Sequence, residues 1–209
     1  MSQQTTRRVP HPASPPQVRP FGTTWFIRAS KALLTFTVGG FALFVVFGNV
    51  TDYWTNFRFV SHVFSMDAQK PALHAVSNIN YRAVEWTWFH HAAYVGVILT
   101  ETAIMVTCLA SAWQQARRLT AGDAEFRRAK RWGVAGCTLG LFLWFFGFQA
   151  VAGEWFGMWM NETWNGIPDA VRLCTYIGGV LIFLTMGNDR SEDERPAAAV
   201  SSGTSASGR

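Results

Sequence analysis

The chain has 209 residues with a formal net charge of +5, and 49% of its residues are hydrophobic. Its mean hydropathy of +0.10 averages polar ends with an apolar middle. A soluble domain has little reason to build several helices that are apolar on every side, so this pattern excludes a soluble globular fold. Four blocks are close to the roughly 20 apolar residues that a helix needs to cross a bilayer. They are residues 32–50, 89–112, 133–153 and 167–186.

The sequence therefore predicts an all-α protein, a four-helix transmembrane bundle that occupies residues 25–186. Tryptophans gather at the ends of the four blocks, as expected for indole rings at the headgroup level. Residues 1–24 are rich in Pro and Arg, and residues 187–209 mix charged residues with Ala, Ser and Gly. Both segments contain too few apolar residues to fold alone, so we expect two disordered cytoplasmic tails.

The basic residues predict the orientation. Of the 18 Lys and Arg residues, 14 precede the first span, separate the second from the third, or follow the fourth. An excess of Lys and Arg marks the cytoplasmic side of a membrane protein. We therefore expect both termini in the cytoplasm, with the protein in a bacterial inner membrane. The positive charge is explained by topology, with some attraction for anionic lipid, and predicts no nucleic-acid partner.

A short amphipathic segment lies in the first predicted periplasmic loop. Within residues 56–67, Phe57, Val60 and Phe64 follow one another at i, i+3 and i+7. This spacing places them on one face of a helix. We expect a short interfacial helix lying on the outer membrane surface.

The third span carries glycines at steps of three, four and seven residues. In an α-helix these positions share one face, and a further heptad along that face reaches Glu154. Small residues on one face allow a neighbouring helix to approach closely. We expect helix packing at Gly133, Gly136, Gly140 and Gly147.

The three cysteines are widely spaced, and each lies inside a predicted span. No pair forms a CxxC motif, and no histidine is near any of them in the sequence. This pattern disfavours a disulfide framework, a zinc site or a covalently attached haem. We expect Cys108, Cys137 and Cys174 to be small packing residues.

Several short blocks resemble the bacterial family of "predicted small integral membrane proteins" of unknown function. The resemblance covers roughly residues 30–186 and implies a four-helix inner-membrane protein with no assigned activity. The blocks are Gly48-Asn49-Val50-Thr51-Asp52-Tyr53, Asn56-Phe57, Phe59-Val60, His62-Val63, Ser65-Met66-Asp67, His91-Ala92-Ala93-Tyr94, Gly153-Glu154-Trp155-Phe156 and Trp164-Asn165-Gly166.

Glu101 is the one acidic residue near the middle of a predicted span. A carboxylate at that depth costs about 2.5–3.5 kcal/mol on insertion scales, so such groups usually face the bundle interior. Counting about 1.5 Å per residue from the span ends places Trp144, Thr175 and Tyr176 at a similar depth. We expect a protonated, neutral Glu101 in a hydrogen bond to a neighbouring helix, with a proton or ion path and a subunit contact as alternatives.

Histidines, carboxylates and an asparagine gather on the predicted periplasmic side. Imidazole and carboxylate groups from different helices can converge on Zn, Cu, Ni or Fe. The alternatives are another ligand site, or helix capping and loop hydrogen bonds. Haem held by two histidines would have to recruit His62, because His90 and His91 share one helix end. The group comprises Asn49, Asp52, His62, His90, His91 and Glu154.

Three classes of function remain open from the sequence. The first is a non-enzymatic accessory, assembly or scaffold subunit, which needs no catalytic constellation and contacts the lipid bilayer and other membrane proteins. The second is a small solute or ion-linked transporter that uses Glu101. The third is a periplasm-facing metal or haem protein. We favour the first and predict no cofactor, while metal and haem stay open within the third.

Overall fold

The computed structural model describes residues 18–69, 75 and 78–190. These residues form helices and turns without a strand, and one isolated bridge pairs Gln69 with Asn161. Four helical segments have the length and composition to cross a membrane, which confirms the predicted all-α class and its four spans. The segments are α1 (Thr23–Thr51), α4 (Thr87–Ala116), α5 (Asp123–Leu141) continued by η2 (Phe142–Trp155), and α6 (Ile167–Thr185).

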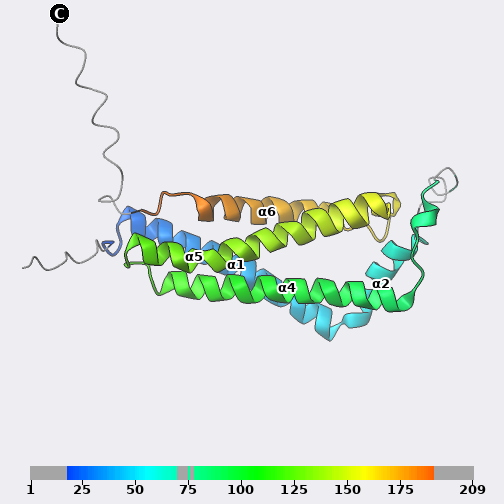
Figure 1. The fold of residues 1–209 in the computed structure, drawn as a ribbon, viewed down its shortest axis with the longest axis horizontal. Coiled ribbons are helices and arrows are strands. Elements are labelled where there is room, and N and C mark those ends of the chain that lie inside the picture. Colours follow the sequence, from blue (N-terminus) through cyan, green and yellow to red (C-terminus); the bar gives the residue numbers. More distant parts are fainter. Residues whose placement is uncertain (1–17, 70–74, 76–77, 191–209) are drawn as a thin grey trace, which may run out of the picture.

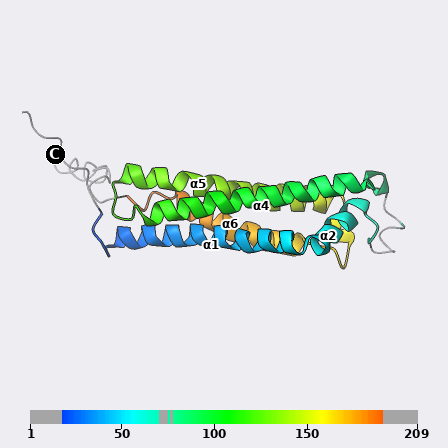
Figure 2. The ribbon, with the colours of Figure 1, turned by 90° about the horizontal axis from the view of Figure 1, so that it is seen from below.

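The four segments run side by side as an elongated bundle (Figure 1). Helix α1 packs along α4, α4 packs on α5, and α6 packs on α5 and η2. The view from below shows the α4–α5 hairpin above α1 (Figure 2). Shorter elements lie at the far end of the bundle from the termini, namely α2 (Tyr53–Ser65), η1 (Asn80–Arg82) and η3 (Met158–Met160).

Large apolar side chains face outward from all four segments, including Phe145 of η2, which exposes 62% of its surface. Phe44 on α1, Leu99 on α4 and Ile182 on α6 expose 76%, 64% and 66% of their surface. Such exposure is the arrangement expected of helices that face lipid rather than water. A buried core of Val38, Ala42, Ile104, Cys108, Cys137, Leu143 and Ile177 lies between the helices. The predicted packing role of two cysteines fits this core, while Cys174 is half-buried.

Three of the four predicted glycines lie where helices approach closely. A Cβ on Gly133 would meet Ser111 and Thr35 at 2.9 Å, and a Cβ on Gly136 would lie 2.6 Å from the Cys108 sulfur. A Cβ on Gly140 would lie 3.2 Å from Ile177. These glycines let α5 pack against α1, α4 and α6.

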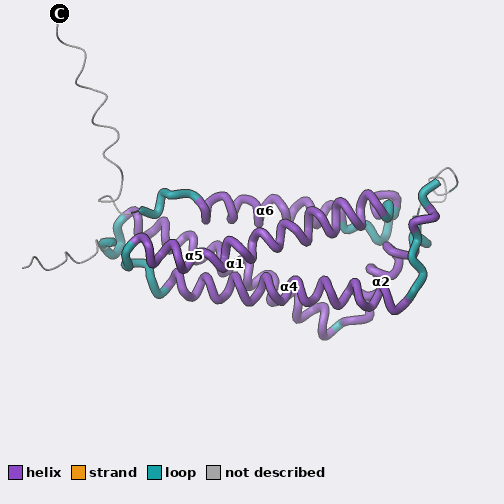
Figure 3. The backbone as a smooth tube through the Cα atoms, in the orientation of Figure 1, coloured by secondary structure: helices purple, strands orange, loops and turns teal. Residues whose placement is uncertain are grey.

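Gly147 does not share that packing face. A Cβ there would meet only Leu143 of its own helix, and Glu154 is exposed. The reason is that η2 is a π-helix, whose i→i+5 hydrogen bonds fit more residues into each turn than the α-helical 3.6. Residues seven apart therefore no longer align, although the tube runs on as helix from α5 into η2 (Figure 3).

At the end of the bundle near the termini, α1 and α5 extend beyond the apolar blocks of the sequence. Helix α1 begins at Thr23 and α5 begins at Asp123, so both include charged residues. The backbone N–H of Val18 donates to the carbonyl of Thr120, and Asp189 is buried. Residues 18–24 and 187–190 therefore differ from the predicted disordered tails. The remainder of those tails, residues 1–17 and 191–209, lies outside the described residues.

A helix forms at the predicted amphipathic segment, and it is wedged between other helices. On one side of α2, the Phe57 ring stacks on His91 of α4 at 4.0 Å. On the other side, the Phe64 ring meets Phe156 at 4.7 Å, and Phe59 packs near Phe148 of η2. Helix α2 thus closes the end of the bundle by joining α4 to η2.

Candidate functional site

Glu101 lies on the inward face of α4 and is 3% exposed. The side-chain amide of Asn49, near the end of α1, donates a hydrogen bond of 2.6 Å to its Oε2 atom. The hydroxyl of Tyr94 donates to the backbone and side-chain oxygens of Asn49, each at 3.2 Å. Three polar side chains from two helices therefore satisfy one another inside the bundle.

The partners expected for Glu101 from its depth lie elsewhere. The Thr175 hydroxyl donates to the carbonyl of Val171 on its own helix, and Tyr176 is 63% exposed. Trp144 borders the same small cavity as Glu101, although no hydrogen bond joins the two. The sequence placed the carboxyl correctly inside a span but missed Asn49 as its partner.

The cavity beside Glu101 has a volume of about 10 Å³. This is room for about one water molecule. Its walls include Val38 and Phe41 of α1 and Ile177 of α6. The same three residues also border a larger open groove. The buried carboxyl therefore lies just behind that groove.

The groove runs between α1 and α6 and has a volume of about 690 Å³. We call it the α1–α6 groove. Its α1 side is formed by Leu34, Thr37, Val38 and Phe41. Its α6 side is formed by Arg172, Leu173, Thr175, Tyr176, Ile177, Gly179 and Val180. Most of the exposed lining is apolar, with polar groups at Thr37, Arg172, Thr175 and Tyr176.

The predicted periplasmic polar residues form separate pairs. The Tyr53 hydroxyl and His91 Nδ1 are 2.7 Å apart, and His62 Nδ1 lies 2.8 Å from Asp67 Oδ1. Both Asp52 and Glu154 are exposed. The structure thus brings Asn49 to Glu101 and leaves the other members of the group apart.

His90 is held at both ring nitrogens. Its Nε2 lies 2.6 Å from the carbonyl oxygen of Val84, which can only accept, so Nε2–H is the donor. Its Nδ1 lies 3.0 Å from the Ser61 hydroxyl. In the neutral ring Nδ1 accepts that bond, so neither nitrogen is free for a metal. Among the described residues, no group of three or more His, Cys, Asp or Glu side chains could hold a metal ion.

A cluster of charges is buried at the opposite end of the bundle, and sequence reasoning missed it. Arg28 of α1 is completely buried. Its guanidinium donates to Asp123 at 2.7 Å, to the carbonyls of Leu119 and Ala121, and to the backbone oxygen of Asp189 at 3.0 Å. One side chain therefore ties α1 to the α4–α5 turn and to the segment after α6.

Two lysines complete this buried charge cluster. Lys31 of α1 and Lys130 of α5 lie 3.2 Å and 2.7 Å from the Asp189 carboxylate. Burial alone would raise the pKa of Asp189, but the hydrogen bond and charge of Lys130, together with Lys31, outweigh it and hold the pKa below its ordinary 3.8. The cluster fastens the helix ends together.

The family of this protein is shown by one family model that matches most of the chain. A family model for predicted small integral membrane proteins (DUF2165) matches residues 27–187, which span all four membrane segments. The chain belongs to this family. No curated protein and no solved structure matches it. For this DUF2165 protein, then, function has to be argued from its own geometry.

Proposed function

We propose that this DUF2165 protein is a non-enzymatic accessory subunit of an inner-membrane complex. In this proposal the α1–α6 groove receives a transmembrane helix of a partner subunit. The groove itself is the observation that supports the proposal most, because it leaves one side of the bundle open at membrane depth. Lipid could fill an apolar groove, so the occupant has to be argued from the polar groups around it.

Tyr176 favours a protein occupant. Its ring is 63% exposed, and the next residue, Ile177, borders the cavity that holds Glu101, so Tyr176 lies well inside the membrane span. Acyl chains cannot hydrogen-bond to a phenol, and an unsatisfied polar group in hydrocarbon is costly. A neighbouring helix can supply an acceptor for it.

Small residues beside Tyr176 support a helix in particular. Thr175 and Gly179 are four residues apart on the exposed face of α6. A Cβ added to Gly179 would have nothing within 4 Å inside this chain. Unlike Gly136, therefore, Gly179 contributes no close packing to its own bundle. Paired small residues at this spacing allow a second helix to approach closely.

The proposal includes the orientation expected from the charges. Both termini lie on the cytoplasmic side, so the buried charge cluster faces the cytoplasm and α2 faces the periplasm. Reporter fusions at each terminus and in the α2–α4 connection test this orientation. The same side for both termini and the opposite side for the connection is the expected result.

A matched pair of glycine variants tests the partner. Gly179→Ile fills the α1–α6 groove, while Gly96→Ile adds the same side chain to α4 at a glycine that also has nothing within 4 Å. Each tagged variant is purified from the native host in mild detergent, and the accompanying membrane proteins are quantified by mass spectrometry. We expect a stoichiometric partner with wild type and Gly96→Ile, and its loss with Gly179→Ile.

Two outcomes contradict the accessory-subunit proposal. One is a wild-type protein that purifies alone from its native membrane at reproducible yield. The other is a partner retained equally by both glycine variants, which would move the contact away from the α1–α6 groove.

A second candidate is an ion-linked carrier, because polar side chains lead from the outer end of α4 to Glu101. His91 contacts Tyr53, whose ring lies 4.8 Å from that of Tyr94, and Tyr94 bonds to Asn49. Beyond Glu101 the core continues through the buried side chains of Ile104 and Cys108.

Proteoliposome flux separates this candidate from the first. A carrier shows proton or cation flux that Glu101→Gln abolishes while the amide of Asn49 keeps an acceptor. Wild-type liposomes with no flux above empty ones would remove the candidate.

A further inference from the structure

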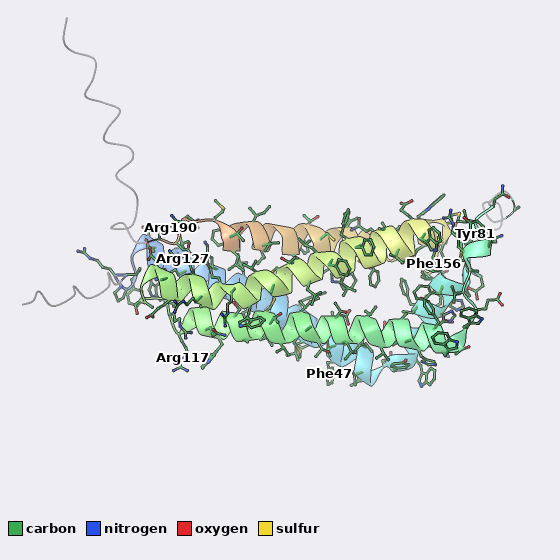
Figure 4. The ribbon with its side chains drawn as sticks, viewed as in Figure 1. Phe47, Tyr81, Arg117, Arg127, Phe156 and Arg190 are labelled. Carbon is green, nitrogen blue, oxygen red and sulfur yellow. The ribbon has the colours of Figure 1, made fainter. Side chains whose placement is uncertain are left out.

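A polar pocket of about 410 Å³ lies at the turn end of the α4–α5 hairpin. Helix α4 contributes Gln114, and the turn that follows it contributes Arg118. Helix α5 contributes Glu125, Arg128, Ala129 and Arg131. We call this the arginine pocket. Figure 4 labels two neighbouring residues at this end of the molecule, Arg117 and Arg127, far from Phe156 at the other end.

Among the described residues, the arginine pocket carries a net positive charge. It holds three guanidinium groups and one carboxylate, that of Glu125. Within the described part of the chain, no carboxylate lies within ion-pair distance of Arg128 or Arg131. Guanidinium groups bind phosphate oxygens through paired N–H donors. The pocket therefore has the chemistry of a phosphate site.

Its position relative to the membrane favours a phosphate that belongs to a lipid. Exposed indoles flank the pocket, with Trp113 on α4 and Trp132 on α5 showing 65% and 45% of their surface. Such rings prefer the headgroup level of a bilayer. The arginines thus lie where phospholipid headgroups end and acyl chains begin.

The two helices also offer a path for acyl chains below the pocket. Ala110 and Val106 lie about two and three turns from Arg118 along α4, and Ala135 lies about one turn from Arg131 along α5. All three are exposed, and two of them are alanines. The hairpin therefore presents a shallow apolar surface leading away from the arginines.

We propose that the arginine pocket binds the headgroup phosphate of an anionic phospholipid, with its acyl chains along the exposed α4–α5 surface. Basic pockets between membrane helices on the cytoplasmic side are a recurring form of anionic-lipid recognition. The site lies on α4 and α5, so it is independent of the α1–α6 groove and of the partner proposed there.

Lipid titration of the delipidated, full-length protein, followed by native mass spectrometry, tests the site. The probes are phosphatidylglycerol and phosphatidylcholine with identical acyl chains, and inorganic phosphate alone. We expect wild type to bind phosphatidylglycerol more tightly than phosphatidylcholine. The double variant Arg128→Gln/Arg131→Gln should bind phosphatidylglycerol about thirtyfold more weakly, which corresponds to losing two basic groups near a membrane surface.

Two further variants make the test independent of folding defects. Glu125→Gln removes the one carboxylate that lines the pocket in the described part of the chain, so the affinity of this variant for phosphatidylglycerol should rise severalfold. Arg117→Gln removes a guanidinium at the same end of α4 that lies outside the pocket, over Trp113, and should leave affinity unchanged. Glutamine is a good helix former, so these exposed substitutions keep the helices intact.

Three results would overturn the proposal. The first is equal wild-type affinity for the two lipids, since the arginines would then not read the headgroup charge. The second is an unchanged affinity in the double variant. The third is inorganic phosphate binding as tightly as phosphatidylglycerol, which would assign the pocket to free phosphate.

Discussion

The side-chain amide of Asn49 on α1 donates a 2.6 Å hydrogen bond to Glu101 on α4, deep inside the bundle. This contact joins the end of one helix to the middle of the next. Because α1 ends at Thr51 and α2 then turns between α4 and η2, the outer part of α4 is covered by α2 instead of α1. The hydrogen bond thus lies where the helix that covers α4 changes from α1 to α2.

Removing Asn49 should destabilise the bundle. In Asn49→Leu the Glu101 carboxyl loses its donor, and interhelical hydrogen bonds in membranes contribute about 0.6 kcal/mol on average and up to about 1.7 kcal/mol. We expect a loss of about 1–2 kcal/mol in reversible detergent unfolding. Thr100→Val is the control, because the Thr100 hydroxyl bonds only to Gly96 on its own helix.

The double variant Asn49→Leu/Glu101→Leu completes a thermodynamic cycle. Replacing both partners leaves no unpaired polar group. The double variant should therefore lose less free energy of unfolding than the two single variants lose together. Strict additivity of the two losses would show that the contact contributes nothing to stability.

Helix α1 offers a second test through two of its glycines. A Cβ on Gly39 would lie 2.9 Å from the backbone nitrogen and side chain of Leu109, whereas a Cβ on Gly48 would have nothing within 4 Å. Gly39→Ala should therefore cost about 1–3 kcal/mol through overpacking. Gly48→Ala should be neutral or slightly stabilising, because alanine favours the helix. Equal thermal stability of the two variants would disprove close packing between α1 and α4.

The buried charge cluster predicts a dependence of stability on pH. The pKa of Asp189 is lower in the folded protein than its ordinary value of 3.8. Its contribution is therefore complete above that value and is lost as the pH falls through the lowered folded pKa. Unfolding measured from pH 7 down to pH values below about 4 should show this loss in wild type and not in Asp189→Asn.

Asp189→Asn should also be less stable at pH 7. It leaves Lys31 and Lys130 buried without their carboxylate, and breaking a buried pair costs about 3–5 kcal/mol. The control is Asp169→Asn, whose ion pair with Arg172 is exposed and contributes little. A wild-type pH profile identical to that of Asp189→Asn would assign the acid sensitivity to other groups.

The membrane spans could be predicted because length and apolar composition alone determine them. The ends of the spans could not be predicted, because Arg28 and Lys31 resemble the basic residues that precede a first span on the cytoplasmic side. In the structure both side chains are buried. Arg28 pairs with Asp123 and Lys31 pairs with Asp189, and both carboxylates are distant in the sequence. Burial of charge by distant partners leaves no local pattern to detect.

The partner of Glu101 was missed for a related reason. Asn49 lies close to the end of the first apolar block, which predicts a place at the periplasmic surface. In the structure α1 ends at Thr51 beside the middle of α4, so Asn49 meets Glu101 instead. The π-helical turns of η2 had a similar effect on Gly147, because a heptad rule assumes α-helical winding throughout.

The central claim is that the α1–α6 groove docks a partner helix, and photocrosslinking in native membranes tests it most directly. A photoreactive amino acid replaces either Tyr176 in the groove or Leu99 on the outward side of α4. The two positions are equally exposed, at 63% for Tyr176 and 64% for Leu99. We predict a crosslink to one distinct membrane protein from position 176 and none from position 99. Crosslinks from position 176 to lipid alone, or only to a second copy of this chain, would contradict the claim.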